Sequence, residues 1–189
     1  YYLGMAYMGG IGITKDIPRA VVWLVQASKA NIVDAQKNAG ICFEKLNKLR
    51  QAATMYLAAA ENGDPYAMER IADFYADGKI ITKCDELANK FYEEASNKGN
   101  CSAQNKLAYR YYNGERKEKT LNRAVYWWMK ASAGNIADAQ NRLATLYFAG
   151  EGVIQDVGHA VLLWKKAAEN GNIDAVITLA KNYSDDSIV

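Results

Sequence analysis

The chain has 189 residues, half of them hydrophobic, and its 23 basic side chains nearly balance 21 acidic ones, giving a formal net charge of +2. This balance argues against a dedicated nucleic-acid-binding protein, in which basic residues are in clear excess on one face. No apolar run approaches the roughly 18 residues of a membrane-spanning helix. The three irregularly spaced cysteines predict neither a disulfide framework nor a metal site.

A short pattern recurs along the whole chain. It consists of a large residue, a small residue directly after it and an aromatic residue three places further on, as in Leu3, Gly4 and Tyr7. Further copies begin at Ala39, Ile71, Leu107, Leu143 and Leu179. The step is 36 residues everywhere except between positions 39 and 71, where it is 32. A period of this length indicates stacked helical repeats.

Helix start and stop signals fit the same period. Asp64 and Asp156 are placed as N-caps, and Pro65 follows at a first helical position. Glycines, or Asn31 and Asn135, stand where a helix ends in a left-handed residue. In chain order we predict helices over 1–9, 17–30, 33–46, 48–61, 65–77, 85–98, 101–113, 118–133, 137–149, 157–170 and 173–183.

The second repeat has an unusual turn between its two helices. Other repeats have a glycine-rich turn, such as GGIGITKD at 9–16, whereas the second repeat has EKLNKLRQ at 44–51. We therefore predict a tighter and more basic turn, four residues shorter than the others. The same shortening explains why the similar phrases NIVDAQ (31–36) and NIADAQ (135–140), which link successive repeats, lie 104 residues apart.

Each predicted second helix carries two alanines seven residues apart with a bulky apolar residue between them. In the first repeat these are Ala20, Trp23 and Ala27, and we expect all three on one packing face. The bulky residue is Met55, Phe91, Trp127 and Leu163 in the repeats that follow. Trp164 in the fifth repeat falls one place after the position expected for it.

These positions together resemble the Sel-like repeat of the tetratricopeptide-like α/α solenoids. The first repeat carries the pattern at Leu3, Gly4, Tyr7, Gly10, Gly12, Ile13, Asp16, Ala20, Trp23, Ala27, Asn31 and Ala35. The resemblance covers essentially the whole chain. It implies an all-α fold, a right-handed α/α superhelix of about five helix-turn-helix repeats and a final helix.

We expect one solenoid over residues 1–189, with units at approximately 1–34, 35–66, 67–102, 103–138, 139–174 and a partial unit at 175–189. Arrays of this kind normally end in a polar capping element. Because both ends of the sequence stop inside a repeat, we expect it to be a piece of a longer protein. No signal peptide is visible, and the compartment (periplasmic, secreted or cytoplasmic) stays open.

No motif in the sequence indicates a reaction. His159 is the only histidine, and the sequence suggests no positioned partner that would make it a general base. The stretch GGIGITK is rich in glycine, but it joins two predicted helices and does not follow a strand, as a phosphate-binding loop does. We therefore predict no enzymatic activity, no metal and no cofactor.

The family resemblance implies which positions could bind a partner, because the first helix of each pair lines the concave surface of such arrays. Tyr109, Tyr112 and Phe148 form an aromatic group there, flanked by Asn105 and Asn141, whose amides can pair with a peptide backbone. The alternatives are that the tyrosines pack against neighbouring helices and that nearby carboxylates form a solvated face. The predicted partner-binding residues are Ile41, Glu44, Glu69, Asp73, Asn105, Tyr109, Tyr112, Asn141, Thr145 and Phe148.

The sequence thus predicts a non-enzymatic scaffold that binds a protein or peptide partner in its concave groove. Nucleic acid and a membrane span are not expected. The alternative, implied by bacterial members of the family, is an immunity or inhibitor protein that neutralises a toxin or effector. The same alternative includes a secreted or cell-surface protein that binds a host factor.

Overall fold

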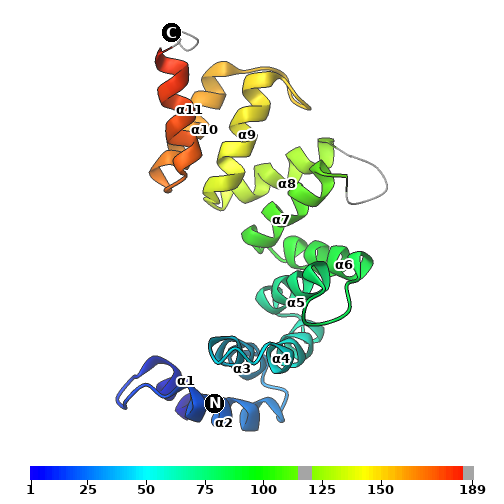
Figure 1. Ribbon diagram of the computed structural model, residues 1–189, viewed down its shortest axis with the longest axis vertical. Coiled ribbons are helices and arrows are strands. Elements are labelled where there is room, and N and C mark those ends of the chain that lie inside the picture. Colours follow the sequence, from blue (N-terminus) through cyan, green and yellow to red (C-terminus); the bar gives the residue numbers. More distant parts are fainter. Residues whose placement is uncertain (115–120, 185–189) are drawn as a thin grey trace. The chain divides into compact units, whose positions relative to one another are not determined.

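The computed structural model describes residues 1–114 and 121–184, and the described residues form helices and no strand (Figure 1). The contacts divide the chain into two units, residues 1–100 and 101–189. The first unit contains α1 (Tyr2–Gly9), α2 (Ile17–Ser28), α3 (Val33–Lys45), α4 (Leu49–Glu61), α5 (Pro65–Asp77) and α6 (Asp85–Asn97). The second contains α7 (Cys101–Tyr112), α8 (Leu121–Ala133), α9 (Ala137–Ala149), α10 (Val157–Glu169) and α11 (Ile173–Ser184).

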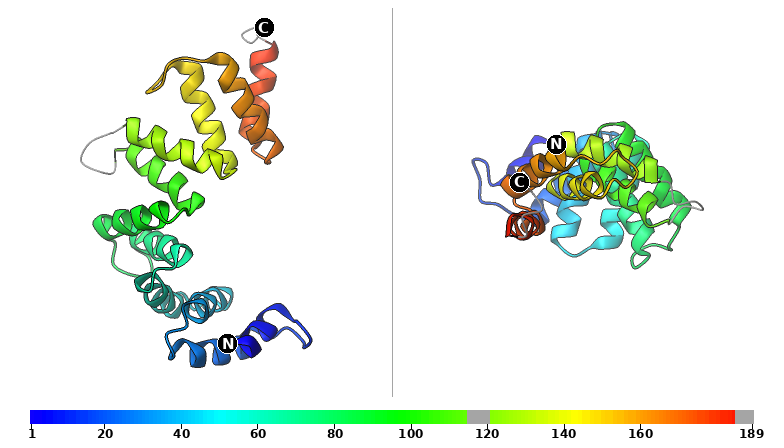
Figure 2. Two further views of the ribbon diagram at one scale, coloured as in Figure 1. Left: turned by 180° about the vertical axis from the view of Figure 1, so that it is seen from behind. Right: turned by 90° about the horizontal axis from the view of Figure 1, so that it is seen from above.

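Each helix packs against the next one within its unit. In the second unit, α9, α10 and α11 lie side by side, as two views of the ribbon show (Figures 1 and 2). The all-α prediction is confirmed, and the predicted helix ends agree with the described ones to within two residues, apart from the start of the eighth helix. Residues 118–120, which the sequence assigned to the eighth helix, lie outside the described residues.

Aspartate side chains begin several helices. Asp16, Asp64 and Asp156 each accept a hydrogen bond from the backbone N–H three residues later, at 2.9, 2.8 and 2.8 Å. These bonds satisfy N–H groups that the first helical turn leaves without an intrahelical partner. Cys84 occupies the same position in the third repeat and makes no side-chain cap bond. The predicted N-caps are therefore confirmed.

The links between repeats contain residues in the left-handed conformation. Asn31 and Asn135 have φ angles of 55° and 60°, and Gly63 has 93° in the equivalent place. Asparagine tolerates this region better than other residues with a side chain. A third asparagine, Asn47 with φ of 56°, turns the chain between α3 and α4, where the glycine-rich turn of the other repeats is missing.

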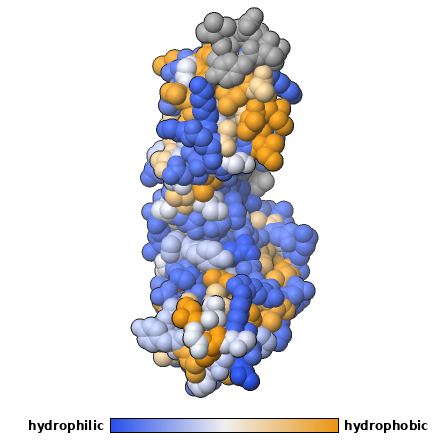
Figure 3. Space-filling model, turned by 90° about the vertical axis from the view of Figure 1, so that its left-hand side faces the viewer, coloured by the Kyte–Doolittle hydropathy of each residue, from blue (hydrophilic) through white to orange (hydrophobic). Residues whose placement is uncertain are grey.

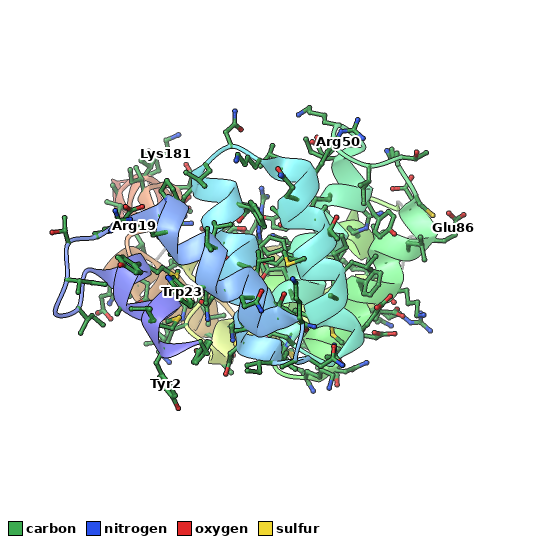
Figure 4. The ribbon with its side chains drawn as sticks, turned by 90° about the horizontal axis from the view of Figure 1, so that it is seen from below. Tyr2, Arg19, Trp23, Arg50, Glu86 and Lys181 are labelled. Atoms are coloured by element: carbon green, nitrogen blue, oxygen red, sulfur yellow. The ribbon has the colours of Figure 1, made fainter. Side chains whose placement is uncertain are left out.

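The most deeply buried bulky residue of each second helix lies one place after the predicted one, although the predicted Trp127 and Leu163 of the fourth and fifth repeats are also buried. Trp23 is 44% exposed (Figure 4). The fully or almost fully buried residues are Leu24, Tyr56, Tyr92, Trp128 and Trp164. Trp164, which the sequence pattern placed out of register, therefore occupies the regular core position.

Small residues of the first helices explain this correction. A Cβ atom on Gly4 would lie 2.8 Å from Cγ of Leu24, and one on Gly40 would lie 2.6 Å from Cε1 of Tyr56. In the first two repeats the glycine after the large residue thus receives the bulky side chain of the second helix, and alanine stands at this position in the later repeats. Close approach of this kind leaves no room for a further methyl group.

The surface of the described residues is mixed. Seen from one side, hydrophilic residues cover much of it and apolar residues gather in smaller patches (Figure 3). Val176 and Ile177 of α11 are about half exposed. Across residues 1–114 and 121–184, the longest apolar helices fall short of what crossing a bilayer requires.

Candidate partner-binding site

The predicted residues of the first unit lie on α3 and α5, where a hydrogen-bonded network joins them. Glu44 accepts a 2.7 Å bond from the hydroxyl of Tyr56 and is also paired with Arg70. Arg70 reaches Asp73 through its other terminal nitrogen at 2.7 Å, and Asp73 accepts a 2.6 Å bond from Tyr92. The guanidinium of Arg70 therefore bridges the carboxylates of Glu44 and Asp73. Each carboxylate also accepts a hydrogen bond from a tyrosine hydroxyl.

This network shifts the protonation equilibria of its members. Burial raises the pKa of Tyr56 far above its ordinary value, and the hydrogen bond and charge of Glu44 act in the same direction. Burial lowers the pKa of Arg70, but its hydrogen bond to Glu44 and the charges of Glu44 and Asp73 outweigh that effect and raise it. Tyr56 is therefore neutral and Arg70 charged over the whole physiological range.

Glu69 and Lys37 belong to the same face of the first unit. Glu69 is only 6% exposed and accepts a 2.9 Å bond from Nδ2 of Asn100. Lys37 bonds Asp34 at 2.7 Å and Asp64 at 3.1 Å. Most charges on this face are therefore paired internally and do not form the solvated face that the sequence left open as an alternative. Ile41 is half-buried among them.

The aromatic residues predicted in the second unit pack on two core tryptophans. The rings of Tyr109 and Tyr112 lie 5.3 and 5.4 Å from that of Trp128, and Phe148 lies 5.4 Å from Trp164. Packing against a neighbouring helix, the alternative left open by the sequence, is thus present. Tyr109 and Tyr112 nevertheless remain half-buried, with part of each side chain in contact with solvent.

The two predicted asparagines, Asn105 and Asn141, differ in the hydrogen bonds that their side chains make. Asn105 accepts a 3.0 Å bond from Nε1 of Trp128 and donates a 3.0 Å bond to Asp138, so both of its amide atoms are used inside the protein. Oδ1 of Asn141 and Nε1 of Trp164 are both buried without a hydrogen-bond partner. Of the two amides, that of Asn141 is the one with an acceptor that has no partner inside the protein.

The side chain of Arg142 in α9 contacts Tyr109 in α7. Nε of Arg142 donates a 2.6 Å bond to the hydroxyl of Tyr109, and the guanidinium also lies 5.3 Å from the centre of that ring. Tyr109 in turn donates a 3.1 Å bond to Asp138. Burial raises the pKa of Tyr109, and Asp138 adds to the increase while Arg142 opposes it.

Arg142 is oriented without being neutralised. Among the described residues no carboxylate lies within the 4.0 Å ion-pair distance of its nitrogens. Its one side-chain hydrogen bond there uses Nε. The two terminal nitrogens can therefore donate to an acceptor on another molecule, and such charge-assisted bonds are about twice as strong as neutral ones.

A pocket of about 150 Å³ adjoins Arg142. Tyr112, Trp128, Thr145, Leu146, Ala149 and Glu151 complete its lining. It brings the predicted residues Tyr112 and Thr145 together, while Phe148 lies outside the lining. We call the surface formed by Asn105, Tyr109, Tyr112, Trp128, Asn141, Arg142 and Thr145 the α7–α9 face.

Arg70 and Arg142 were not among the partner-binding residues predicted from the sequence. Arg70 and Arg142 each stand directly before the large residue of their repeat, and Lys106 stands at the same position in the repeat between them. A basic residue therefore recurs every 36 residues at this position, and this recurrence is a signal that could have identified the arginines from the sequence alone. Asp138 was not recognised as a partner because its contacts with Asn105 and Tyr109 cross from one helix pair to the next. The bond from Trp128 to Asn105 lies within one pair, but the two residues are 23 positions apart.

Five segments of the chain, residues 1–32, 33–64, 65–100, 101–135 and 137–172, match the Sel1 repeat. The chain belongs to the Sel1 repeat family. Sel1 repeats form all-α solenoids, which confirms the predicted fold. Members of the Sel1 repeat family are generally non-enzymatic protein-interaction scaffolds.

Solved structures agree with this assignment. A Sel1 repeat protein from Oxalobacter formigenes is 29% identical, with a TM-score of 0.87 over 97% of this chain and 76% of its own. A protective antigen of uropathogenic Escherichia coli with an SLR fold is 30% identical, with a TM-score of 0.90 over 96% of this chain and 40% of its own. The Sel1 repeat chain thus spans less than half of that antigen.

More distant structures share the fold alone. An immunity protein from Pseudomonas aeruginosa is 17% identical, with a TM-score of 0.55 over 92% of this chain and 66% of its own. No curated protein is significantly similar in sequence to this Sel1 repeat chain.

Proposed function

We propose that this Sel1 repeat chain is a protein-interaction scaffold whose α7–α9 face binds a segment of a partner protein. The observation that carries the proposal is the pocket beside Arg142, whose terminal nitrogens lack an acceptor among the described residues. An apolar side chain of the partner enters the pocket against Tyr112 and Trp128. A carboxylate or carbonyl oxygen of the same segment accepts from Arg142.

The face is suited to binding because its residues are already fixed. Tyr109 holds Arg142 at 2.6 Å, and Asp138 holds both Tyr109 and Asn105. A partner therefore needs to order few side chains on the scaffold when it binds, which reduces the entropic cost of association. Thr145 is exposed at the pocket, so its hydroxyl oxygen can accept a hydrogen bond from the partner's backbone.

Substitutions at the pocket test the proposal. The chain, immobilised on beads, captures partners from an extract of its native source, and the captured protein is then purified for affinity measurement. Thr145→Trp fills the pocket from an exposed position, and Arg142→Glu reverses its charge. Both should weaken binding of the same partner at least tenfold. Lys165→Glu, an exposed change on α10, is the control and should leave the affinity unchanged.

Equal affinity of wild type, Thr145→Trp and Arg142→Glu for that partner would exclude the α7–α9 face. The triple variant Tyr109→Ala/Tyr112→Ala/Phe148→Ala then asks whether the wider aromatic group takes part, provided that its helix content by circular dichroism is unchanged.

The inhibitor alternative makes a different prediction about the captured protein. The Pseudomonas aeruginosa structure named as an immunity protein has the same fold. If this chain has such a role, its partner is an enzyme or toxin whose activity falls in proportion to the bound fraction. A partner that keeps its full activity in the complex supports the scaffold proposal.

A further inference from the structure

We propose a second binding site, at the edge of the first unit, that takes an apolar side chain of a partner protein together with a neighbouring acidic one. The site lies between the start of α4 and the turn that joins α5 to α6. It is distinct from the α7–α9 face and does not depend on the function proposed for that face.

Two adjoining hollows form the site. One, of about 250 Å³, has apolar walls that include Ala53 and Leu57 of α4 and Ile80 and Ile81 of the turn. The other, of about 490 Å³, is lined by the turn residues 78–82 and is the more polar of the two. Arg50, Ile80 and Ile81 line both hollows, so a ligand in one is in reach of the other. Figure 4 shows Arg50 at the rim of the first unit.

Comparison of repeats explains why space exists there. The residue that corresponds to Ile80, 72 positions later, is Gly152. A Cβ atom on Gly152 would lie 2.7 Å from Cγ of Leu121 in α8, so that turn rests directly on the helix. A side chain at this position needs room between turn and helix. In the third repeat Ile80 supplies such a side chain, and the apolar hollow lies beside it.

Charge determines what the site can accept. The guanidinium of Arg50 is exposed and makes no ion pair or hydrogen bond with any described side chain. Lys79 and Lys83, by contrast, are paired with Asp77 at 3.0 Å and Asp85 at 3.6 Å. Arg50 is therefore the cation at the rim with free donors, and a carboxylate is the group that matches its planar fork.

The size of the apolar hollow limits the ligand further. At about 250 Å³ it has room for one apolar side chain, and the adjoining hollow of about 490 Å³ has room for the acidic residue beside it. A segment of a partner protein supplies both. Lys45 and Lys48, close to Arg50 in the sequence, are also exposed, and this local positive charge favours a partner segment that is acidic around its apolar residue.

A matched pair of probes tests this site. The isotope-labelled 189-residue chain is titrated with N-acetyl-Leu-Asp-amide or N-acetyl-Leu-Asn-amide and followed by amide chemical shifts. We expect saturable shifts at Ala53, Leu57, Ile80 and Ile81 with the Asp probe, at a Kd of about 1 mM. The Asn probe and the Arg50→Glu variant should each weaken binding about tenfold. Lys29→Glu, an exposed change on the same unit, should have no effect.

Three results would overturn the proposal. One is the absence of shifts at these residues with the Asp probe at about twenty times the expected Kd. Another is equal affinity for the Asp and Asn probes, and the third is unchanged affinity in Arg50→Glu. Because the α7–α9 face contributes none of the residues observed, loss of this site leaves the function proposed for that face untouched.

Discussion

The indole N–H of Trp128 donates a 3.0 Å hydrogen bond to Oδ1 of Asn105, whereas the corresponding atoms of Trp164 and Asn141, one repeat later, are both unbonded. The two pairs have the same residue types in the same register. They differ in their surroundings, because Asp138 holds the amide of Asn105 at 3.0 Å. Repetition in sequence therefore does not produce repetition in hydrogen bonding.

The first prediction compares phenylalanine at the two tryptophans. Trp128→Phe removes a hydrogen bond and leaves Oδ1 of Asn105 without its donor, in addition to the loss of ring size. Trp164→Phe removes a buried N–H that has no partner. We expect Trp128→Phe to lower the free energy of unfolding by about 1–3 kcal/mol more than Trp164→Phe. Urea unfolding of both variants measures this difference, and equal losses would contradict the prediction.

The second prediction concerns glycines inside helices. Gly40→Ala places a methyl group 2.6 Å from the buried ring of Tyr56, so it should destabilise the protein by about 1–3 kcal/mol. Gly158→Ala, in the first turn of α10, meets nothing closer than an aspartate oxygen at 3.5 Å. It should stabilise by up to about 1 kcal/mol through helix propensity. Melting temperatures that move in the same direction would be evidence against this account.

The third prediction tests the network of the first unit. Arg70→Leu leaves Glu44 and Asp73 facing each other without their shared cation. Because all three side chains are 21–29% exposed, we expect a loss of about 2–3 kcal/mol, below the 3–5 kcal/mol of a fully buried pair. Arg19→Leu, which breaks a more exposed pair with Asp16, is the control and should cost less than about 1 kcal/mol. Chemical denaturation of both variants gives the comparison.

The fourth prediction is a dependence of stability on pH. The pKa of Tyr56 is raised in the folded protein, while in the unfolded chain it is about 10. Above that pH the unfolded state releases a proton that the folded state retains, so the free energy of unfolding falls as pH rises. Tyr56→Phe lacks this proton, and its slope should be less steep by up to about 1.4 kcal/mol per pH unit.

Urea unfolding of wild type and Tyr56→Phe between about pH 9 and 11 checks the fourth prediction. The stability difference between the two proteins should shrink across this range, because the wild type loses the contribution of Tyr56. A constant difference at every pH would show that Tyr56 ionises normally in the folded state.

Helix positions could be predicted closely because their signals are local. Asp16, Asp64 and Asp156 cap helices through a bond to a backbone N–H three residues away, and the left-handed Asn31 and Asn135 end them. These effects depend on a few consecutive residues. A single repeat of the sequence therefore contains all the information that they require.

Side-chain burial was less predictable because neighbouring positions compete for the same face. Residues three and four places after Ala20 both lie near its side of the helix. The glycine of another helix determines which of them is buried, and Gly4 makes space for Leu24, not for Trp23.

The candidate site was predicted least completely, because its geometry depends on partners in other repeats. Arg70 and Glu44 are 26 positions apart, and Arg142 and Tyr109 are 33 apart. The sequence identified the tyrosine and the acid but gave no reason to pair them with those arginines. Whether a carboxylate is free to bind or already neutralised depends on such pairs.

The bridge made by Arg70 also bears on how this chain could have evolved or be re-engineered. Glu44 and Tyr56 come from the second repeat, Arg70 and Asp73 from the third, and Tyr92 completes the chain of contacts. Excision of the third repeat would leave Glu44 without its cation, whereas excision of the second would leave Arg70 paired with Asp73 alone. Although the backbone is modular, these repeats are not interchangeable parts, and duplicating the second and third repeats together would preserve the pairing of Glu44 with Arg70.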